Sequence, residues 1–155
     1  MKTTLRLLGA QDIDFMLKVE NDPEVWSFSS LCDAPYTRAE IADFCNNSES
    51  RVSVENLTQL RYVIVRNNQS LGFIDLYDIQ GSRAKVAIII YPKELRGGGI
   101  GQCALELLRN EICVELGIKN LTAEVDPSNI DAINFFKKIG ITSQTLMQSS
   151  SFENF

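Results

Sequence analysis

A glycine-rich stretch from Arg96 to Gly101 constrains the fold of this 155-residue chain more than any other feature. The segment before it, Val86 to Tyr91, is β-branched and almost continuously apolar, which is typical of a strand covered on both faces. The segment after it predicts a helix that ends at Gly117, because apolar residues recur there at helical spacing. These apolar residues are Ala104, Leu105, Leu108, Ile112 and Leu116. A strand, a glycine turn and a helix are therefore expected in direct succession.

The beginning of this helix is predicted to bind a phosphate group. N–H groups in the first turn of a helix lack partners within the helix, and glycines let a ligand approach them closely. Arg96 adds a positive charge beside them. A Walker loop is excluded, because Gln102 and Cys103 stand where Lys and Ser or Thr are required. A dinucleotide fingerprint fits poorly, because most of the chain precedes the motif.

Length, charge and composition narrow the function classes. A chain of 155 residues is expected to form one domain, spanning residues 1–155. Its net charge of −5 argues against a nucleic-acid partner and suits a cationic substrate. No apolar run reaches the roughly 20 residues of a membrane span, and the start lacks a signal-peptide pattern, so we expect a cytoplasmic protein without a membrane partner. The four cysteines lack C-x-x-C spacing and histidine is absent, so free thiols and no metal site are expected.

Apolar periodicity predicts the order of the elements. Strands are expected near residues 4–8, 60–66, 70–79 and 84–91, and helices near 11–21 and 37–48, before a final helix, strand, helix and strand. This order predicts an α+β fold with a mixed, mostly antiparallel sheet, about four flanking helices, and a parallel strand pair that separates at a notch. Thr37 and Glu40 have the spacing of a capping box, and Pro127 suits the first position of the last helix.

Three separated segments resemble the GNAT superfamily of acyl-CoA-dependent N-acyltransferases. Arg96 to Gly101 matches the family's R/Q-x-x-G-x-G/A loop, which binds the pyrophosphate of coenzyme A. Leu5 to Leu17 is similar to the first strand and helix, and Asn129 to Gly140 is similar to the helix N-x-x-A-x-x-F/L-Y-x-K-x-G. The resemblance extends from Leu5 to about Ile141. It implies the GNAT fold, acetyl-CoA as co-substrate without a metal, and direct transfer of the acetyl group to a primary amine.

The resemblance also implies which residues bind the cofactor. The family's strand before the loop carries a bulge whose backbone pairs with the pantetheine arm, which assigns this role to Ile89, Ile90 and Tyr91. A bulge frees an N–H from the ladder, so the amide of Ile89 is expected to stabilise the oxyanion. Asn129 is expected to contact the cofactor. The expected pyrophosphate loop consists of Arg96, Gly97, Gly98, Gly99, Ile100, Gly101 and Gln102. An ordinary central strand and a helix cap are the alternatives for Ile89 and Asn129.

Glu124 is the candidate general base. An alkyl ammonium with a pKa of about 10 must lose a proton before it attacks. Glu124 matches the base glutamate of ribosomal-protein alanine acetyltransferases, although an exposed strand glutamate without a catalytic role is the alternative. Many relatives carry a tyrosine as general acid where this chain has Phe136, which has no proton to give. Packing accounts for Phe136, and Tyr77 or Tyr91 could substitute.

The acceptor site is expected to involve Asp75 and Asp78. Leu71 to Ile79, together with Ala87 to Ile90, looks like the spermidine/spermine N-acetyltransferase branch, whose members carry acids at these two positions. Further acids could surround a polyamine, and a solvated acidic face is the alternative. These acids are Glu20, Asp22, Glu24, Asp33, Glu40 and Asp43.

The resemblance therefore implies an N-acetyltransferase with a polyamine-like acceptor. A protein N-terminus is the second acceptor class, and an acyl-CoA-binding protein that has lost turnover is the competing hypothesis. The family expects two strands after Ile141, but Thr142 to Met147 suffices only for the first. The last strand is thus expected to be short or missing, and a second copy in a homodimer could complete the sheet edge.

Overall fold

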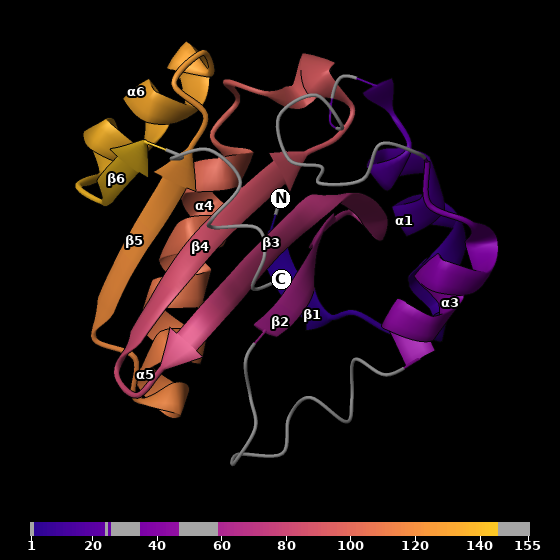
Figure 1. Ribbon diagram of the computed structural model, residues 1–155, viewed down its shortest axis with the longest axis horizontal. Coiled ribbons are helices and arrows are strands. Elements are labelled where there is room, and N and C mark those ends of the chain that lie inside the picture. Colours follow the sequence, from indigo (N-terminus) through magenta and orange to yellow (C-terminus); the bar gives the residue numbers. More distant parts are fainter. Residues whose placement is uncertain (1, 24, 26–34, 47–58, 146–155) are drawn as a thin grey trace.

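The computed structural model describes residues 2–23, 25, 35–46 and 59–145, which form a six-stranded sheet with helices on both faces (Figure 1). In chain order the elements are β1 (Thr3–Leu7), the 3-10 helix η1 (Ala10–Asp12), α1 (Ile13–Glu20), α3 (Arg38–Asn46), β2 (Gln59–Arg66), β3 (Gln69–Gln80), β4 (Arg83–Ile90), the 3-10 helix η3 (Lys93–Leu95), α4 (Ile100–Leu107), the π-helix η4 (Leu108–Ile112), α5 (Cys113–Leu116), β5 (Asn120–Val125), α6 (Ile130–Ile139) and β6 (Thr142–Thr145). The predicted α+β fold is confirmed.

The strands lie in the sheet in chain order, from β1 to β6. Neighbours from β1 to β4 are antiparallel, and β5 is parallel to both β4 and β6. The mixed, mostly antiparallel sheet is confirmed, but there are two parallel pairings where the sequence predicted one. The prediction that a last strand is short or missing, and that another subunit completes it, concerns residues 146–155, which lie outside the described residues.

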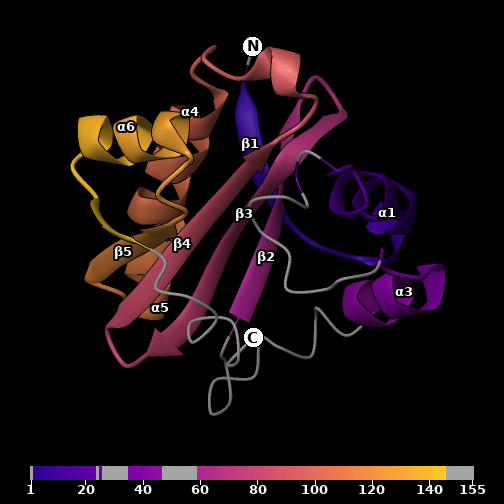
Figure 2. The same ribbon diagram turned by 45° about the horizontal axis from the view of Figure 1, so that its top comes forward.

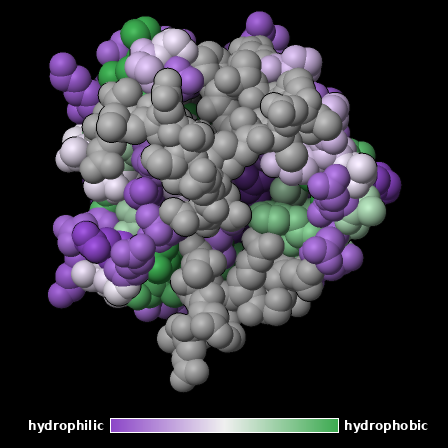
Figure 3. Space-filling model, viewed as in Figure 1, coloured by the Kyte–Doolittle hydropathy of each residue, from purple (hydrophilic) through white to green (hydrophobic). Residues whose placement is uncertain are grey.

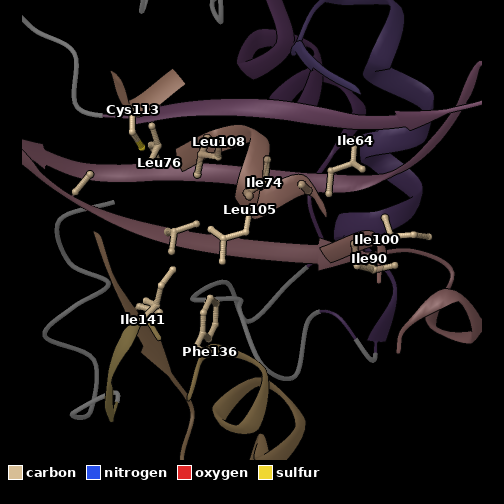
Figure 4. Close-up of a cluster of buried hydrophobic side chains, with 14 of the residues drawn as sticks. Ile64, Ile74, Leu76, Ile90, Ile100, Leu105, Leu108, Cys113, Phe136 and Ile141 are labelled. Atoms are coloured by element: carbon tan, nitrogen blue, oxygen red, sulfur yellow. The ribbon is translucent and has the colours of Figure 1, made fainter. Parts of the chain in front are cut away.

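Two helical layers cover the sheet, with α1 and α3 on one face and α4, α5 and α6 on the other (Figure 2). In the second layer, Leu105 and Leu108 pack in one cluster with Ile74 of β3 (Figure 4). Successive side chains of a strand point to opposite faces, so Ile90 contributes to this cluster and Ile89 packs on the other. The odd-numbered side chains near the end of β4 therefore face α1 and α3.

The helix predicted to run from the glycine loop to Leu116 is interrupted by the π turn of η4. Leu108 and Cys113 are both buried, five residues apart, as the wider π turn allows. This shift carries Leu116, which the predicted stripe placed inward, to 36% exposure. The end of the helix is as predicted, because Gly117 adopts the left-handed conformation with φ of 73°.

The caps of two other helices test the predicted boundaries. Thr37 and Glu40 form the predicted capping box, since each accepts a hydrogen bond from the other's backbone N–H. The predicted start of the last helix at Pro127 is wrong. Asn129 is the cap instead, because its side chain accepts a bond from the N–H of Ala132 at 3.2 Å.

Candidate active site

The first turn of α4 has the geometry expected of an anion site. Gly99 caps the helix with φ of 87°, and the N–H of Cys103 donates to the carbonyl of Gly99 at 3.0 Å. The N–H groups of Ile100, Gly101 and Gln102 precede that bond and have no acceptor within the helix. These donors lie at the positive end of the helix dipole, where they can hold a diphosphate.

The glycines of the loop have two different structural roles. Gly97 and Gly99 have φ of 82° and 87°, a conformation that residues with a Cβ adopt at a cost. A Cβ on Gly101 would instead lie 3.3 Å from the ring of Phe135, so this glycine lets α4 pack closely against α6. The loop therefore needs glycine for its backbone path and for its packing.

Beside the loop, β4 and β5 separate at the predicted notch. β4 pairs with β5 only from Arg83 to Lys85. Among the described residues, no strand pairs with Val86–Ile90 on this edge, while the opposite edge pairs with β3 as far as Ile90. This edge is about 16 Å long at the usual rise of a strand, and it ends beside the glycine loop.

The alternation of the antiparallel ladder decides which amides of β4 face the notch. Tyr91 donates its N–H to the carbonyl of Leu71 at 2.9 Å, so Ile89, two residues earlier, also directs its backbone groups toward β3. Ile88 and Ile90 direct theirs toward the notch. The carbonyl of Ile90 accepts a bond from Arg96 Nε at 3.3 Å, in agreement with this direction.

The bulge predicted at Ile89 is wrong. The register of β4 with β3 is continuous from Lys85 to Ile90, and the irregularities lie in β3, between Tyr77 and Gln80 and close to Gly72. Without a bulge, the amide of Ile89 stays on the β3 side. The predicted cofactor residues Ile90 and Arg96 do lie together. They are at the end of the notch beside the glycine loop, which we call its upper end; the end at Lys85 is its lower end.

Glu124 is the centre of a side-chain network on the face that carries α1 and α3. Its Oε1 accepts a bond from the hydroxyl of Tyr77 at 3.1 Å and an ion pair from Lys85 Nζ at 3.0 Å. Lys85 Nζ also contacts Asp78 Oδ2 at 3.2 Å. The side chain of Glu124 is 7% exposed, so it is not an exposed strand glutamate, and its role as a base stays a prediction.

The network changes the proton affinity of its members. Burial, and then the nearby charge of Glu124, raise the pKa of the Tyr77 phenol, so this hydroxyl stays protonated and donates. Burial alone would lower the pKa of Lys85, but its contacts with Glu124 and Asp78 outweigh burial and raise that pKa. Glu124 therefore faces two groups that are protonated at neutral pH.

A β-bulge positions this network. Asp78 lies in the register shift of β3 and has φ of 48°, which is uncommon for a residue other than glycine. Bulges redirect side chains, and backbone strain is often found at functional sites. Here the bulge lets Tyr77 reach Glu124 and lets Asp78 reach Lys85 from consecutive positions of one strand.

Asp75, the other predicted acceptor acid, lies in a buried ion network. Arg61 donates from Nε and from its terminal nitrogen to both carboxylate oxygens of Asp75 at 2.8 Å, and to Glu20 at 2.7 Å. Its guanidinium also lies 4.7 Å from the centre of the Phe73 ring. Burial would lower the pKa of Arg61, but Asp75 and Glu20 outweigh burial and raise it. The geometry gives Asp75 an internal cation as partner, and its role toward an acceptor stays a prediction.

Asp22 and Glu40, two of the remaining predicted acids, have separate partners. Asp22 accepts a bond from the Tyr91 hydroxyl at 3.0 Å, which raises the pKa of Tyr91, and these two residues line a cavity of about 150 Å³ that Arg96 also borders. Glu40 serves the capping box. Glu24 and Asp33 lie outside the described residues. A larger hollow, of about 390 Å³, lies at the other end of β5 and contains none of the predicted site residues.

Two further sequence predictions can be placed. Phe136 is 7% exposed in the core, as its packing interpretation requires. Tyr77, one of the two tyrosines that could substitute for the family tyrosine, donates its hydroxyl to Glu124. Asn129 acts as a helix cap, which leaves its predicted contact with the cofactor a prediction. Cys45, Cys103 and Cys113 are free thiols, as expected for the cysteines within the described residues.

Sequence reasoning missed Lys85 and Arg61. The available signal was a cation at an inward position of an otherwise apolar strand, because such a charge needs an acidic partner in the fold.

Among the described residues, no group of three metal-ligating side chains is close enough to hold a metal, and no helix is long and apolar enough to cross a membrane. Hydrophilic residues gather at the left of Figure 3, where Figure 1 shows β5 and the turn between β3 and β4.

Comparisons with known proteins agree with this architecture. The family model of the acetyltransferase (GNAT) domain matches residues 2–142. Spermidine N(1)-acetyltransferase of Escherichia coli (strain K12) is 24% identical over 153 residues, which cover 97% of this chain and 78% of that protein.

Solved structures share the fold at low identity. The spermidine N-acetyltransferase from Vibrio cholerae, in complex with CoA and spermine, has a TM-score of 0.73 at 20% identity and covers 89% of this chain and 79% of that chain. AAC(6')-Ib, in complex with ribostamycin and coenzyme A, also has a TM-score of 0.73, at 17% identity, covering 89% and 82%. A domain from Methanocaldococcus jannaschii has a TM-score of 0.76 at 17% identity and covers 96% and 93%.

Proposed function

The chain belongs to the GNAT acetyltransferase family and is an acetyl-CoA-dependent N-acetyltransferase, and from this premise we propose that its acceptor is a small cationic amine of the polyamine class. One observation carries the proposal. Asp78 and Glu124 together hold a primary ammonium, that of Lys85, at 3.2 and 3.0 Å on the face beside the notch. A pair of carboxylates that fits this ammonium also fits the terminal ammonium of a polyamine. The similarity to spermidine acetyltransferases over almost the whole chain supports the same class.

We assign cofactor binding to the backbone at the upper end of the notch. Acetyl-CoA supplies the acetyl thioester when it is bound. The N–H groups of Gly97 to Gln102 hold the diphosphate, with Arg96 adding charge nearby. The notch-facing groups of Ile88 and Ile90 pair with the amides of the pantetheine arm, as a neighbouring strand would. This assignment adds Ile88 to the predicted cofactor site. It also moves the oxyanion donor from the amide of Ile89 to the amide of Ile88 or Ile90.

We assign the general base to Glu124. Tyr77 and Lys85 contact the same oxygen, Oε1, and hold the carboxylate in position. Glu124 takes a proton from the acceptor ammonium, and the resulting amine attacks the thioester carbonyl. Tyr77 and Lys85 are already protonated at neutral pH, so neither can take up that proton.

No general acid is required for the departing thiol. A thiol has a pKa of about 8.5, so its thiolate is a tolerable leaving group near neutral pH. Tyr77, whose pKa is raised, is a weaker acid than free tyrosine and is therefore a poor proton donor to the departing thiolate. Its role is to orient Glu124, and the loss of the family tyrosine at Phe136 lowers the rate without abolishing the reaction.

A catalytically weak acyl-CoA-binding protein is the second candidate, and Phe136 is the observation that favours it. A steady-state assay of thiol release from acetyl-CoA decides between the two. We expect turnover with spermidine and little with a peptide that offers only an N-terminal amine or with an aminoglycoside. Binding of acetyl-CoA without thiol release for any acceptor would establish the second candidate and refute the first.

A further inference from the structure

Lys85 lies at the point where β4 and β5 diverge. It faces Thr122 in the last pair of the parallel ladder, and the unpaired edge of β4 begins with the next residue. Its side chain is 26% exposed and points to the face that carries Glu124, where its ammonium contacts two carboxylates. Lys85 is thus a primary amine held at hydrogen-bond distance from the proposed base.

The direction of the notch brings the reactive end of the cofactor toward this amine. The proposed diphosphate site lies beyond Ile90, at the upper end of the edge. An extended arm that follows the edge from there runs toward Lys85, over about 16 Å of strand. The thioester is at the far end of that arm, so it arrives near the Glu124 carboxylate and the Lys85 amine.

We propose that Lys85 is a self-acetylation site, modified by bound acetyl-CoA before the protein takes up an acceptor amine. The inference rests on the proposed role of Glu124 as base. Glu124 accepts a proton from the Lys85 ammonium, and the neutral Nζ attacks the thioester carbonyl carbon. A C–N bond forms, the nitrogen loses its second proton, the C–S bond breaks, and coenzyme A leaves as a thiolate. The thiolate takes up one of the two protons, and Glu124 releases the other to solvent. The products are an amide at Lys85 and free coenzyme A, with one proton released per transfer.

The modification would change the charge of the acceptor site. Unmodified Lys85 neutralises part of the charge of Asp78 and Glu124 and occupies the place of an acceptor ammonium. An acetylated Lys85 carries no charge, so both carboxylates become available to a cationic acceptor. Self-acetylation would therefore act as a priming step, with a lag in turnover before the modification is complete.

The pH dependence follows from the groups that face Lys85, which are Asp78 and Glu124, with the Tyr77 hydroxyl on the same oxygen of Glu124. These two carboxylates raise the pKa of Lys85 above its ordinary value. The neutral amine is the nucleophile, so the rate of self-acetylation should increase with pH throughout the range in which the protein stays folded.

The test is to incubate the purified chain with acetyl-CoA, without an acceptor, and to follow its intact mass and its peptide map. We expect one acetyl group, on Lys85, added with a first-order rate that does not depend on protein concentration. Proximity should make Lys85 react at least about tenfold faster than the exposed Lys137 and Lys138. Glu124→Gln should slow this modification, and Lys85→Arg, which keeps the charge, should abolish it while the fold is retained.

Equal acetylation of Lys85 and the exposed lysines would overturn the proposal, because it would indicate chemical modification from solution. A rate proportional to protein concentration would overturn it as well, because transfer would then occur between molecules. If spermidine is acetylated while Lys85 stays unmodified, self-acetylation is refuted and the proposed function stands. If neither amine is acetylated although acetyl-CoA binds, the proposed function fails too.

Discussion

The two ends of the notch are built from different parts of the chain. At the upper end, backbone groups of β4 and of the first turn of α4 form the proposed cofactor site, within a single stretch of sequence. At the lower end, the side chains of Tyr77, Asp78, Lys85 and Glu124 form the proposed acceptor site, and they come from three strands. A backbone site depends on local conformation and tolerates changes of side chain. A side-chain site depends on the register of the sheet and on ion pairs, so it is more sensitive to single substitutions.

Gly72→Ala disturbs β4 at the upper end of the notch, and we expect it to have the largest effect on stability. A Cβ on Gly72 would overlap the carbonyl oxygen of Ile89, and φ at Gly72 is 142°. The strand must move, so we expect a loss of about 4 kcal/mol in the free energy of unfolding. Denaturant unfolding monitored by circular dichroism measures it. Gly81→Ala is the matched control, with φ of 60° and open space, and should cost about 1 kcal/mol. Equal losses would show that the close approach to β4 is unimportant.

Arg61→Met breaks the side-chain network beneath the acceptor end. It leaves the buried Asp75 and the partly buried Glu20 without the Arg61 cation, so we expect a loss of about 3 kcal/mol in the free energy of unfolding at neutral pH. Arg66→Met is the control on the same strand. Arg66 donates to an uncharged acceptor, the hydroxyl of Thr3, so its loss leaves no unpaired buried charge and should cost only about 1 kcal/mol. A stability like that of the wild type for Arg61→Met would contradict a structural role for this ion network.

Glu124→Gln separates the two ends of the notch, because it should affect the proposed acceptor site and leave the proposed cofactor site intact. Loss of a general base lowers kcat by about a hundredfold or more, whereas the affinity for coenzyme A should change little. Steady-state kinetics with spermidine and calorimetry with coenzyme A measure the two quantities. A matching loss of coenzyme A affinity, or an unchanged kcat, would show that the two ends are not separate or that the base lies elsewhere.

The smallest expected effect is on the free energy of unfolding at alkaline pH, through Tyr77 and Lys85 of the acceptor site. The raised pKa of Tyr77 means that the unfolded chain, with a tyrosine pKa of about 10, loses its proton at a lower pH than the native state. The stabilising contacts of Lys85 are fully present below its unfolded pKa of about 10.4 and are lost as the pH rises through the raised folded value. Both effects make the free energy of unfolding fall above about pH 10. Urea unfolding between about pH 9 and 11 should show a smaller fall for Tyr77→Phe. Equal slopes would contradict the raised pKa of Tyr77 in the native state.

The same contrast explains how far the sequence alone could be interpreted. The turn at the glycine loop and the capping box of α3 follow from patterns within a few residues, and the notch follows from the predicted order of the elements. The structure confirms all three. The direction of the Ile89 amide depends on one step of register between β3 and β4, which no local pattern specifies. The start of α6 was misplaced because Pro127 and Asn129 are both good boundary residues, and the cap at Asn129 prevails.

The acceptor end was only partly predictable, because its contacts join distant segments. Asp75 and Asp78 are close in sequence, but the β-bulge in β3 gives them separate partners, Arg61 and Lys85. A sequence contains the charges without their pairing, and the pairing decides which carboxylates are available to a substrate. Glu124 was found through family resemblance, whereas its contacts with Tyr77 and Lys85 required the structure.

The most direct test of the central assignment is to follow backbone amide resonances of the protein while coenzyme A is added. We expect the largest shifts at Gly97 to Gln102, from the diphosphate, and at Ile88 and Ile90, from the pantetheine arm, with small shifts in α3. Binding of coenzyme A that leaves the amides of the glycine loop unchanged would contradict the proposed cofactor site.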